Sequence, residues 1–246
     1  MKDNFSKQSD KYAQYRPTYP NDLFDFINQK VKEKQCAWDC GTGNGQIAGE
    51  LAQTFATVYA TDISQQQIEH AVKKDSIYYS VQPAEKTTFE NDTFDLIVVA
   101  QAIHWFDFEA FYQEVYRTAK NEALLCVVGY GRIEICQEID AIITHLYQNI
   151  IGKYWDNERK YIDENYQTIP FPFEEIETPD LVMTQEWSLD HLIGYLNTWS
   201  AVKHFIKENQ DNPINQIQLQ LKEIWGNEQI RTVQFPLLIR AAQIIK

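Results

Sequence analysis

The sequence predicts an α/β fold in which a mostly parallel, doubly wound sheet carries helices on both faces. Three observations support this prediction. Short apolar runs typical of buried strands alternate with segments whose apolar residues recur at helical spacing. A loop with three glycines at alternate positions, Gly41-Thr42-Gly43-Asn44-Gly45, follows the first of these runs. The 246 residues, 44% of them hydrophobic, are enough for one large domain with a sizeable core.

The first strand, loop and helix surround these glycines. Cys36-Ala37-Trp38 is an apolar run that suits a buried strand, and apolar residues recur every fourth position from Ile47 to Phe55. This arrangement places backbone N–H groups and a helix N-terminus beside a bound ligand. A loop for a nicotinamide dinucleotide would need glycine or alanine three residues after Gly43, where this chain has Gln46.

A second strand and helix follow at once. The strand Thr57–Ala60 leads to Asp62, whose carboxylate at the strand tip can accept hydrogen bonds from both hydroxyls of a ribose. Ser64 and Gln67 have the spacing of a capping box, which starts a helix. The residues of this helix expected to face inward are Ile68, Ala71 and Val72.

Three more strands and one helix complete the parallel part of the predicted sheet. The strands are Ile77–Val81, Phe94–Ala100 and Ala123–Gly129. Phe94–Ala100 is nearly all apolar, as a central strand covered on both faces should be. The helical stripe between the last two strands consists of Phe108, Phe111, Tyr112, Val115 and Tyr116. Ligands bind at the carboxyl ends of the strands in such sheets.

The pattern loosens after Gly131, where helices are expected to dominate. Residues 154–172 are aromatic, charged and irregular, and Pro236 marks an edge or a bulge in the final strand. The expected elements are a helix over 135–151, a strand ending at Trp187, a helix from Ser188 towards Phe205, a helix over 213–225 and a strand over 233–244.

Charge and cysteine content exclude several classes of function. The formal net charge of −13 argues against a broad phosphate-binding surface, so we expect no nucleic-acid partner. Four cysteines without paired metal spacing indicate reduced thiols of a cytoplasmic protein and no metal site. Residues 1–4 are polar, and no apolar run approaches the ~18–20 residues that cross a bilayer, so no membrane partner is expected.

The residues from Asp39 to Gly45, followed by Asp62, resemble the first motif and the ribose-binding acid of class I S-adenosylmethionine-dependent methyltransferases, in the methyltransferase type 11 group. The resemblance implies a Rossmann-like, seven-stranded sheet. It also implies S-adenosyl-L-methionine as cofactor and S-adenosyl-L-homocysteine as product. The implied cofactor-binding residues are Tyr15, Arg16, Asp39, Gly41, Thr42, Gly43, Asp62, Ile63, Ala84, Glu85, Gln101 and His104.

The resemblance also assigns roles to two loops. Backbone groups of Ala84 and Glu85 would edge the adenine, and Gln101 would lie near the methionine part of the cofactor. His104 and Trp105 would approach the transferred methyl group. His104 is then either a general base or a hydrogen-bonded loop histidine, and both readings stay open at this point.

An aromatic string, F-x6-Y-x2-Y-R-P-x-Y-P, runs from Phe5 to Pro20. It is similar to the leading segment of a small-molecule branch of these enzymes that includes trans-aconitate methyltransferases. The resemblance implies that the segment folds over the cofactor and that Arg16 meets its carboxylate; the alternative is a packed arm with a surface ion pair. Asn197-Thr198, before Trp199, departs from the pattern of the branch, and residues 154–172 match nothing in it.

The implied organisation is one methyltransferase domain, 1–246. Its expected parts are a cofactor-covering segment (1–30), a cofactor-binding core (31–130), a helical substrate-pocket region (131–230) and a final strand (231–246). The helices after Gly131 would add to the core fold over the pocket.

The expected reaction is methyl transfer to an oxygen, a carboxylate or a hydroxyl, of a small metabolite. His104 is the candidate catalytic residue, and Trp105, Trp155 and Trp199 are expected to line the substrate pocket. The cations considered for an anionic acceptor are Arg132, Lys203 and Arg231. The alternatives are methylation of a protein or other macromolecule, and a non-catalytic protein that binds the cofactor. A monomer and a homodimer are both compatible with the sequence.

Overall fold

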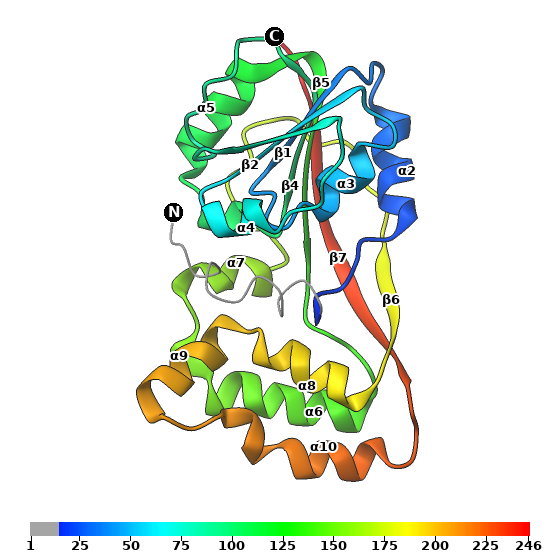
Figure 1. Ribbon diagram of the computed structural model, residues 1–246, viewed down its shortest axis with the longest axis vertical. Coiled ribbons are helices and arrows are strands. Elements are labelled where there is room, and N and C mark those ends of the chain that lie inside the picture. The colour runs from blue at the N-terminus through cyan, green and yellow to red at the C-terminus, as the bar shows by residue number, and fades with distance from the viewer. Residues whose placement is uncertain (1–14) are drawn as a thin grey trace.

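A seven-stranded sheet in the order β3-β2-β1-β4-β5-β7-β6 forms the centre of the molecule (Figure 1). The computed structural model describes residues 15–246, so Phe5 and Tyr12 of the aromatic string lie outside the described residues. The strands are β1 (Cys36–Cys40), β2 (Thr57–Asp62), β3 (Ile77–Val81), β4 (Phe94–Ala100), β5 (Ala119–Tyr130), β6 (Val182–Trp187) and β7 (Arg231–Ile244). The first five pair in parallel, and β7 is antiparallel to both β5 and β6. The predicted doubly wound, mostly parallel sheet is confirmed.

Helices cover both faces of this sheet and also gather at one end of it (Figure 1). The α-helices are α2 (Asn21–Lys30), α3 (Gln46–Leu51), α4 (Gln65–Glu69), α5 (Phe108–Thr118), α6 (Gln137–His145), α7 (Lys160–Asp163), α8 (Leu189–Asn197), α9 (Ser200–Asn209) and α10 (Gln218–Trp225). A π-helical turn, Leu146–Ile150, continues α6. Short 3-10 helices span Ile103–Trp105, Gly152–Tyr154, Asn157–Arg159 and Pro213–Gln216. Among residues 15–246, no helix combines the length and the apolar character needed to cross a membrane.

The alternation of side chains along the strands divides the core into two clusters, one on each face of the sheet. On β4, Leu96 and Val98 pack with α2, α3 and the helices that follow β5. Ile97 and Val99 of the same strand face the other way and pack with α5 and the segment near α7. Such a strand, buried on both faces, explains why its sequence is apolar throughout.

The helix predicted from Ser188 to Phe205 is two helices. Helix α8 ends at Asn197 and α9 starts at Ser200, with Thr198 and Trp199 between them. The Thr198 hydroxyl donates to the Tyr195 carbonyl over 2.6 Å, which satisfies a carbonyl of the last turn. Trp199 is extended (φ −65°, ψ 135°) and only 4% exposed. The break therefore turns an indole into the interior, which an uninterrupted helix would not do.

Pro236 does not mark a sheet edge, because β7 lies between β5 and β6. Residues 231–236 of β7 pair with β6, and residues 237–244 pair with β5. Pro236 stands where the partner changes, so its missing N–H costs the sheet little.

Two residues expected to face inward are exposed instead. Helix α4 ends at Glu69, so Val72 lies beyond it and is 42% exposed. Tyr116 on α5 is 48% exposed, whereas Phe111 and Val115 of the same stripe are fully buried. The Ser64 side chain accepts from the N–H of Gln67, as the capping box predicts.

Candidate active site

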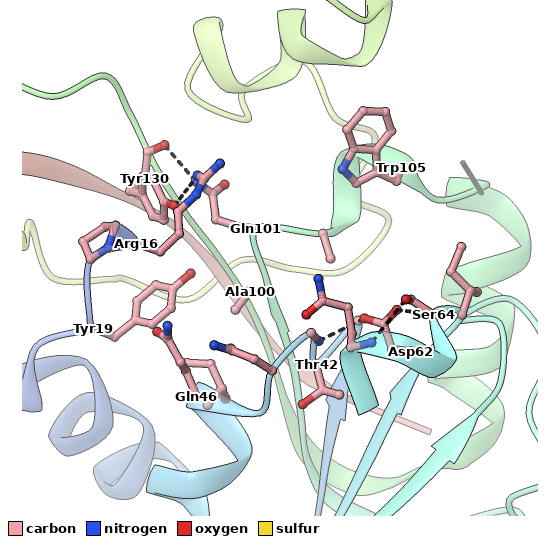
Figure 2. A pocket seen from close by; sticks show the side chains of 18 residues that line it. Arg16, Tyr19, Thr42, Gln46, Asp62, Ser64, Ala100, Gln101, Trp105 and Tyr130 are labelled. Carbon is pink, nitrogen blue, oxygen red and sulfur yellow. Dashed lines mark hydrogen bonds between the residues drawn. The ribbon is translucent and has the colours of Figure 1, made fainter. Parts of the chain in front are cut away.

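A cavity of about 130 Å³ opens at the carboxyl ends of β1, β2 and β4 (Figure 2). This is the point where the chain, after building outward through β2 and β3, returns to place β4 on the other side of β1. Open α/β sheets bind their ligands at such a point. We call it the glycine-loop cavity, because Gly41, Thr42, Gly43 and Asn44 form part of its wall.

Two glycines of this loop meet different geometric demands. Gly41 has φ +72°, and a Cβ atom there would lie 2.6 Å from the Cβ of Ala102. Gly43 has φ +55°, and a Cβ there would meet only the Gln67 side-chain oxygen, at 4.0 Å. A side chain at Gly43 would therefore enter the cavity itself. The loop is closed by the N–H groups of Gly41 and Thr42, which both donate to the Thr61 carbonyl, over 2.8 and 2.9 Å.

Asp62 lies on the wall of this cavity, at the end of β2 (Figure 2). Its Oδ2 accepts from the N–H of Gly43 over 2.9 Å, and its Oδ1 accepts from the N–H of Ser64 over 2.8 Å. These two bonds fix the plane of the carboxylate. A carboxylate has about four lone-pair sites, more than these two bonds use, so the group suits the hydroxyl donors of a ligand.

Asp39 lies below the same loop and is fully buried. Its Oδ2 accepts from the Ala48 N–H over 3.0 Å and from the Thr42 hydroxyl, while Oδ1 has no hydrogen-bond partner among the described residues. Burial raises the pKa of Asp39 to about 7. The side chain is not part of the cavity wall, so its observed contacts hold the loop and the start of α3.

Arg16 forms the opposite wall, together with Tyr130 at the end of β5 (Figure 2). Its Nη1 donates to the Tyr130 hydroxyl over 2.6 Å, and its Cζ lies 5.5 Å from the centre of the Tyr195 ring. Arg16 and Asp62 thus place a cation and an anion on facing walls. Tyr15 packs against α8 instead, with its ring 5.2 Å from that of His191, and takes no part in the wall.

A second, smaller cavity, of about 50 Å³, lies beside the first. Arg16, Gln101 and Trp105 belong to the walls of both cavities. We call it the tryptophan cavity, because Trp155 and Trp199 also line it, with ring centres 5.5 Å apart. The structure therefore brings together the three tryptophans that the sequence analysis selected, from three distant segments.

His104 also lines the tryptophan cavity and is 6% exposed. Burial lowers the pKa of His104 to about 3, and nearby Arg159 adds to the effect. The imidazole is therefore neutral over the physiological range, and it would be a weak proton acceptor. Its Nδ1 lies 3.3 Å from the hydroxyl of Tyr166. This environment favours the hydrogen-bonded reading of His104, and its role as a general base stays a prediction.

Arg159 is a cation of this cavity that the sequence analysis did not select. Its Nε donates to the Tyr147 hydroxyl over 2.8 Å, and its Cζ lies 4.9 Å from the Trp155 ring centre. Across residues 15–246, no hydrogen bond engages its terminal Nη1 and Nη2 atoms. Asp163 lies beside it, with Oδ1 3.6 Å from Nε. The guanidinium is thus held at one edge, which leaves the fork that binds carboxylates available.

The three cations selected from the sequence line neither cavity. Arg231 donates to the carbonyl oxygens of Ile224 and Trp225, at the end of α10. Arg132 lies over the ring of Tyr147. Burial lowers the pKa of Lys203, and the nearby charge of Arg16 lowers it further.

The remaining predicted residues separate into two groups. Ile63 lines the glycine-loop cavity, as does Gln101. Ala84 is buried, and the Glu85 carboxylate accepts from the N–H of Asp107 over 3.1 Å. Neither Ala84 nor Glu85 is in the cavity wall, so their contact with an adenine stays a prediction.

Comparison with known proteins decides the family. A family model described as a methyltransferase domain matches residues 38–127, which include the glycine loop, Asp62 and β4. A Dictyostelium discoideum protein classed as a methyltransferase is 35% identical over 243 residues, covering 96% of this chain and 92% of its own. The chain belongs to the class I S-adenosylmethionine-dependent methyltransferases.

Solved structures agree with this assignment. The methyltransferase has a TM-score of 0.87 and 36% identity to a structure classed as a type II methyltransferase from Anaeromyxobacter dehalogenans, covering 94% of this chain and 99% of that one. A phosphoethanolamine N-methyltransferase from Haemonchus contortus, crystallised with S-adenosyl-L-methionine, has a TM-score of 0.51 at 16% identity, with 98% and 58% of the two chains covered, and so shares the fold. The trans-aconitate resemblance stays a prediction.

The glycine-loop cavity of this methyltransferase fits S-adenosyl-L-methionine. The ligand has a ribose diol, an adenine and a charged amino acid end. The donor set offers a carboxylate at Asp62 for hydroxyls and a guanidinium at Arg16 for a carboxylate. Gly43 leaves open the space that any side chain would fill. The enzyme uses this cofactor, and its binding by Asp62 and Arg16 stays a prediction.

Proposed function

We propose that this methyltransferase transfers the methyl group to a carboxylate oxygen of a small molecule bound in the tryptophan cavity. The observation that carries the proposal is that Arg16, Gln101 and Trp105 line both cavities, which therefore lie side by side. A cofactor in the first cavity and an acceptor in the second would then lie next to each other. Trp105 lines both cavities, so its ring can face a sulfonium cation.

The dimensions of the tryptophan cavity favour a small acceptor. Its volume is about 50 Å³, and its wall includes two nearly buried side chains, Trp199 and His104. The wall combines the three tryptophans and Ile162 with polar and charged side chains, among them Asp156 and Arg159. A segment of a folded protein or of a nucleic acid would need a wider entrance.

The surroundings of His104 favour a carboxylate over a hydroxyl. A hydroxyl acceptor must lose its proton, and a histidine whose pKa is lowered to about 3 would accept that proton poorly near pH 7. A carboxylate is already ionised at that pH and needs no base. The free fork of Arg159 gives an anionic acceptor a partner in the same cavity.

The cofactor, when bound, supplies an electrophilic methyl group on a sulfonium. The protein's contribution is then to align the acceptor oxygen and to exclude water. Holding two reactants in line can lower a barrier by ~7–11 kcal/mol. In this enzyme the alignment would come from the Trp155 and Trp199 rings on the acceptor side and from Asp62 on the cofactor side.

A screen with labelled cofactor tests the proposal. The purified enzyme is incubated with methyl-labelled S-adenosyl-L-methionine and matched sets of small carboxylic acids, alcohols and amines. We expect transfer to carboxylic acids, with a product that base hydrolyses to methanol, as an ester requires. Label on alcohols, amines or proteins, or no transfer while the cofactor still binds, would contradict the proposal.

Replacing Arg159 tests the anion contact. We expect Arg159→Met to raise the KM for the acid about 10- to 100-fold, which corresponds to the ~1.5–3 kcal/mol of a charge-assisted hydrogen bond. The affinity for the cofactor should stay close to that of the wild type. Lys160→Met is the matched control, because Lys160 follows directly and is absent from the cavity wall. An equal loss in both variants would remove Arg159 from the site.

A further inference from the structure

A directed chain of hydrogen bonds runs beside the two cavities, both of which Gln101 lines. It starts at the backbone carbonyl of Tyr130, at the end of β5, and a carbonyl can only accept. Gln101 donates to it through Nε2, over 3.2 Å. The side-chain oxygen of Gln101 is therefore the atom left for the next partner, the hydroxyl of Tyr166, at 3.2 Å. The backbone thus decides which way the Gln101 amide faces.

The next hydrogen bond in this series joins Tyr166 to His104, and its direction follows from the bonds before it. The Tyr166 hydroxyl carries one proton and donates it to Gln101. Its oxygen can only accept from the group on its other side, which is Nδ1 of His104 at 3.3 Å. Nδ1 must therefore hold a proton. Since the ring is neutral near pH 7, it has no second proton, and Nε2 is left as a hydrogen-bond acceptor.

Several contacts hold Tyr166 in place. The side chain is fully buried, and its backbone has φ +59°, a conformation that costs a residue with a Cβ atom and persists only where the surroundings enforce it. Its ring lies against Gly129, where a Cβ would approach Cε2 to 2.6 Å. Arg240 on β7 donates to the Tyr166 carbonyl over 3.0 Å.

We propose that Tyr166 is a positioning residue that holds His104 as the Nδ1–H tautomer and fixes the Gln101 amide. Nε2 of His104 then accepts a hydrogen bond from the molecule in the tryptophan cavity, which His104 lines. The acceptor class is accordingly a small carboxylic acid that also carries a hydroxyl or N–H donor. The statement about the acceptor rests on the proposed function, whereas the tautomer is a property of the protein.

Histidine NMR tests the tautomer without any acceptor. The chain has 5 histidines, so long-range 1H–15N spectra of the 15N-histidine-labelled protein are simple, and a His104→Gln variant assigns the signal. We expect the Nδ1–H pattern in the wild type and its loss in Tyr166→Phe, which removes only the hydroxyl. Tyr161→Phe is the matched control on the same segment, because no described residue hydrogen-bonds to the Tyr161 hydroxyl, and it should keep the wild-type pattern.

Gln101→Met supplies a second test should Tyr166→Phe fold poorly. Without the amide, the Tyr166 hydroxyl is free to donate to Nδ1, and we expect the Nε2–H tautomer to appear. An Nε2–H pattern in the wild type would overturn the proposal, as would an Nδ1–H pattern that persists in both variants.

The part of the proposal that concerns the methyl acceptor is tested by measuring KM. With the acids identified by the labelled screen, Tyr166→Phe should raise the KM for acids that carry a hydroxyl or N–H donor more than for acids that lack one. Equal changes would overturn this half of the proposal. The expected tautomers without methylation of any acid would refute the proposed function and leave Tyr166 as the residue that orders His104.

Discussion

Asp39 and Asp62 serve the glycine loop from opposite sides, and their surroundings give them different properties. Asp39 is sealed beneath the loop and holds Thr42 and Ala48. Asp62 stands in the cavity wall and binds two backbone N–H groups. The same residue type thus orders the loop from below and faces the cavity from above.

Asp62→Asn should weaken cofactor binding about 10- to 100-fold, because hydrogen bonds to a charged group contribute ~1.5–3 kcal/mol. The amide that replaces one oxygen would also face a backbone N–H, at Gly43 or Ser64. Calorimetric titration with S-adenosyl-L-methionine measures the change. Asp75→Asn, at an exposed position outside the cavity, is the control. Equal heats for wild type and Asp62→Asn would show that this carboxylate does not bind the sugar.

Because the pKa of Asp39 is raised in the folded protein, we expect the free energy of unfolding to depend on pH. The folded protein holds this proton up to about pH 7, whereas the unfolded chain releases it near the ordinary value of 3.8. Between these values the folded state binds more protons, so stability falls as pH rises. The limit is about 4 kcal/mol, from roughly three pKa units at ~1.36 kcal/mol each.

Urea unfolding of the wild type and of Asp39→Asn between pH 4.5 and 7.5 measures this effect. Asparagine has no such proton, so the free energy of unfolding of the wild type should fall relative to that of the variant as pH rises towards 7. Two parallel curves would mean that Asp39 titrates in its ordinary range.

At the scale of elements, the Tyr166 ring packs directly against the backbone of β5, because Gly129 has no side chain there. The Gly129→Ala substitution would press a methyl group against the Tyr166 ring, since its Cβ would lie 2.6 Å from Cε2. Overpacking of this kind costs ~1–3 kcal/mol. We expect urea unfolding to show that loss. Gly131→Ala, whose nearest contact would be an ordinary 3.8 Å, should stay within ~0.5 kcal/mol of the wild type.

The elements that could be predicted are those whose apolar residues recur at the spacing of a strand or a helix, or form a short unbroken run. β1 to β4 are apolar runs bounded by turns, and they were predicted nearly in place. The break between α8 and α9 could not be seen, because Thr198 and Trp199 are compatible with a helix until the burial of the indole decides otherwise. Propensity is a weak guide wherever tertiary packing competes with it.

The residues of the candidate site also differ in whether a local sequence pattern marks them. The glycine loop and Asp62 could be found because their function depends on short-range spacing. Arg159 and Tyr166 could not, because they lie in an irregular segment and gain their roles from partners far along the chain. Tyr166, for example, bonds to Gln101, 65 positions earlier. No local pattern records such a contact.

On the scale of the whole molecule, residues at the carboxyl ends of the strands line the glycine-loop cavity, and Trp155, Arg159 and Trp199 from segments after β5 line the tryptophan cavity. A ligand that binds only the folded chain stabilises it by mass action. At a cofactor concentration of 100 times Kd, the gain is about 2.7 kcal/mol. We expect S-adenosyl-L-methionine to raise the Tm of the wild type in a concentration-dependent way.

Asp62→Asn should need a correspondingly higher concentration for the same rise in Tm. A Tm that does not respond to the cofactor in the wild type would contradict binding to the folded state. Thermal unfolding followed by circular dichroism provides both curves.

The position of β7 has a consequence for how the chain is made. It is the last of the seven described strands along the chain, yet it lies inside the sheet, between β5 and β6. Until it arrives, β5 presents an unpaired apolar edge, which invites association with other nascent chains. The sheet can therefore close on this side only after β7 has been synthesised and has paired with β5.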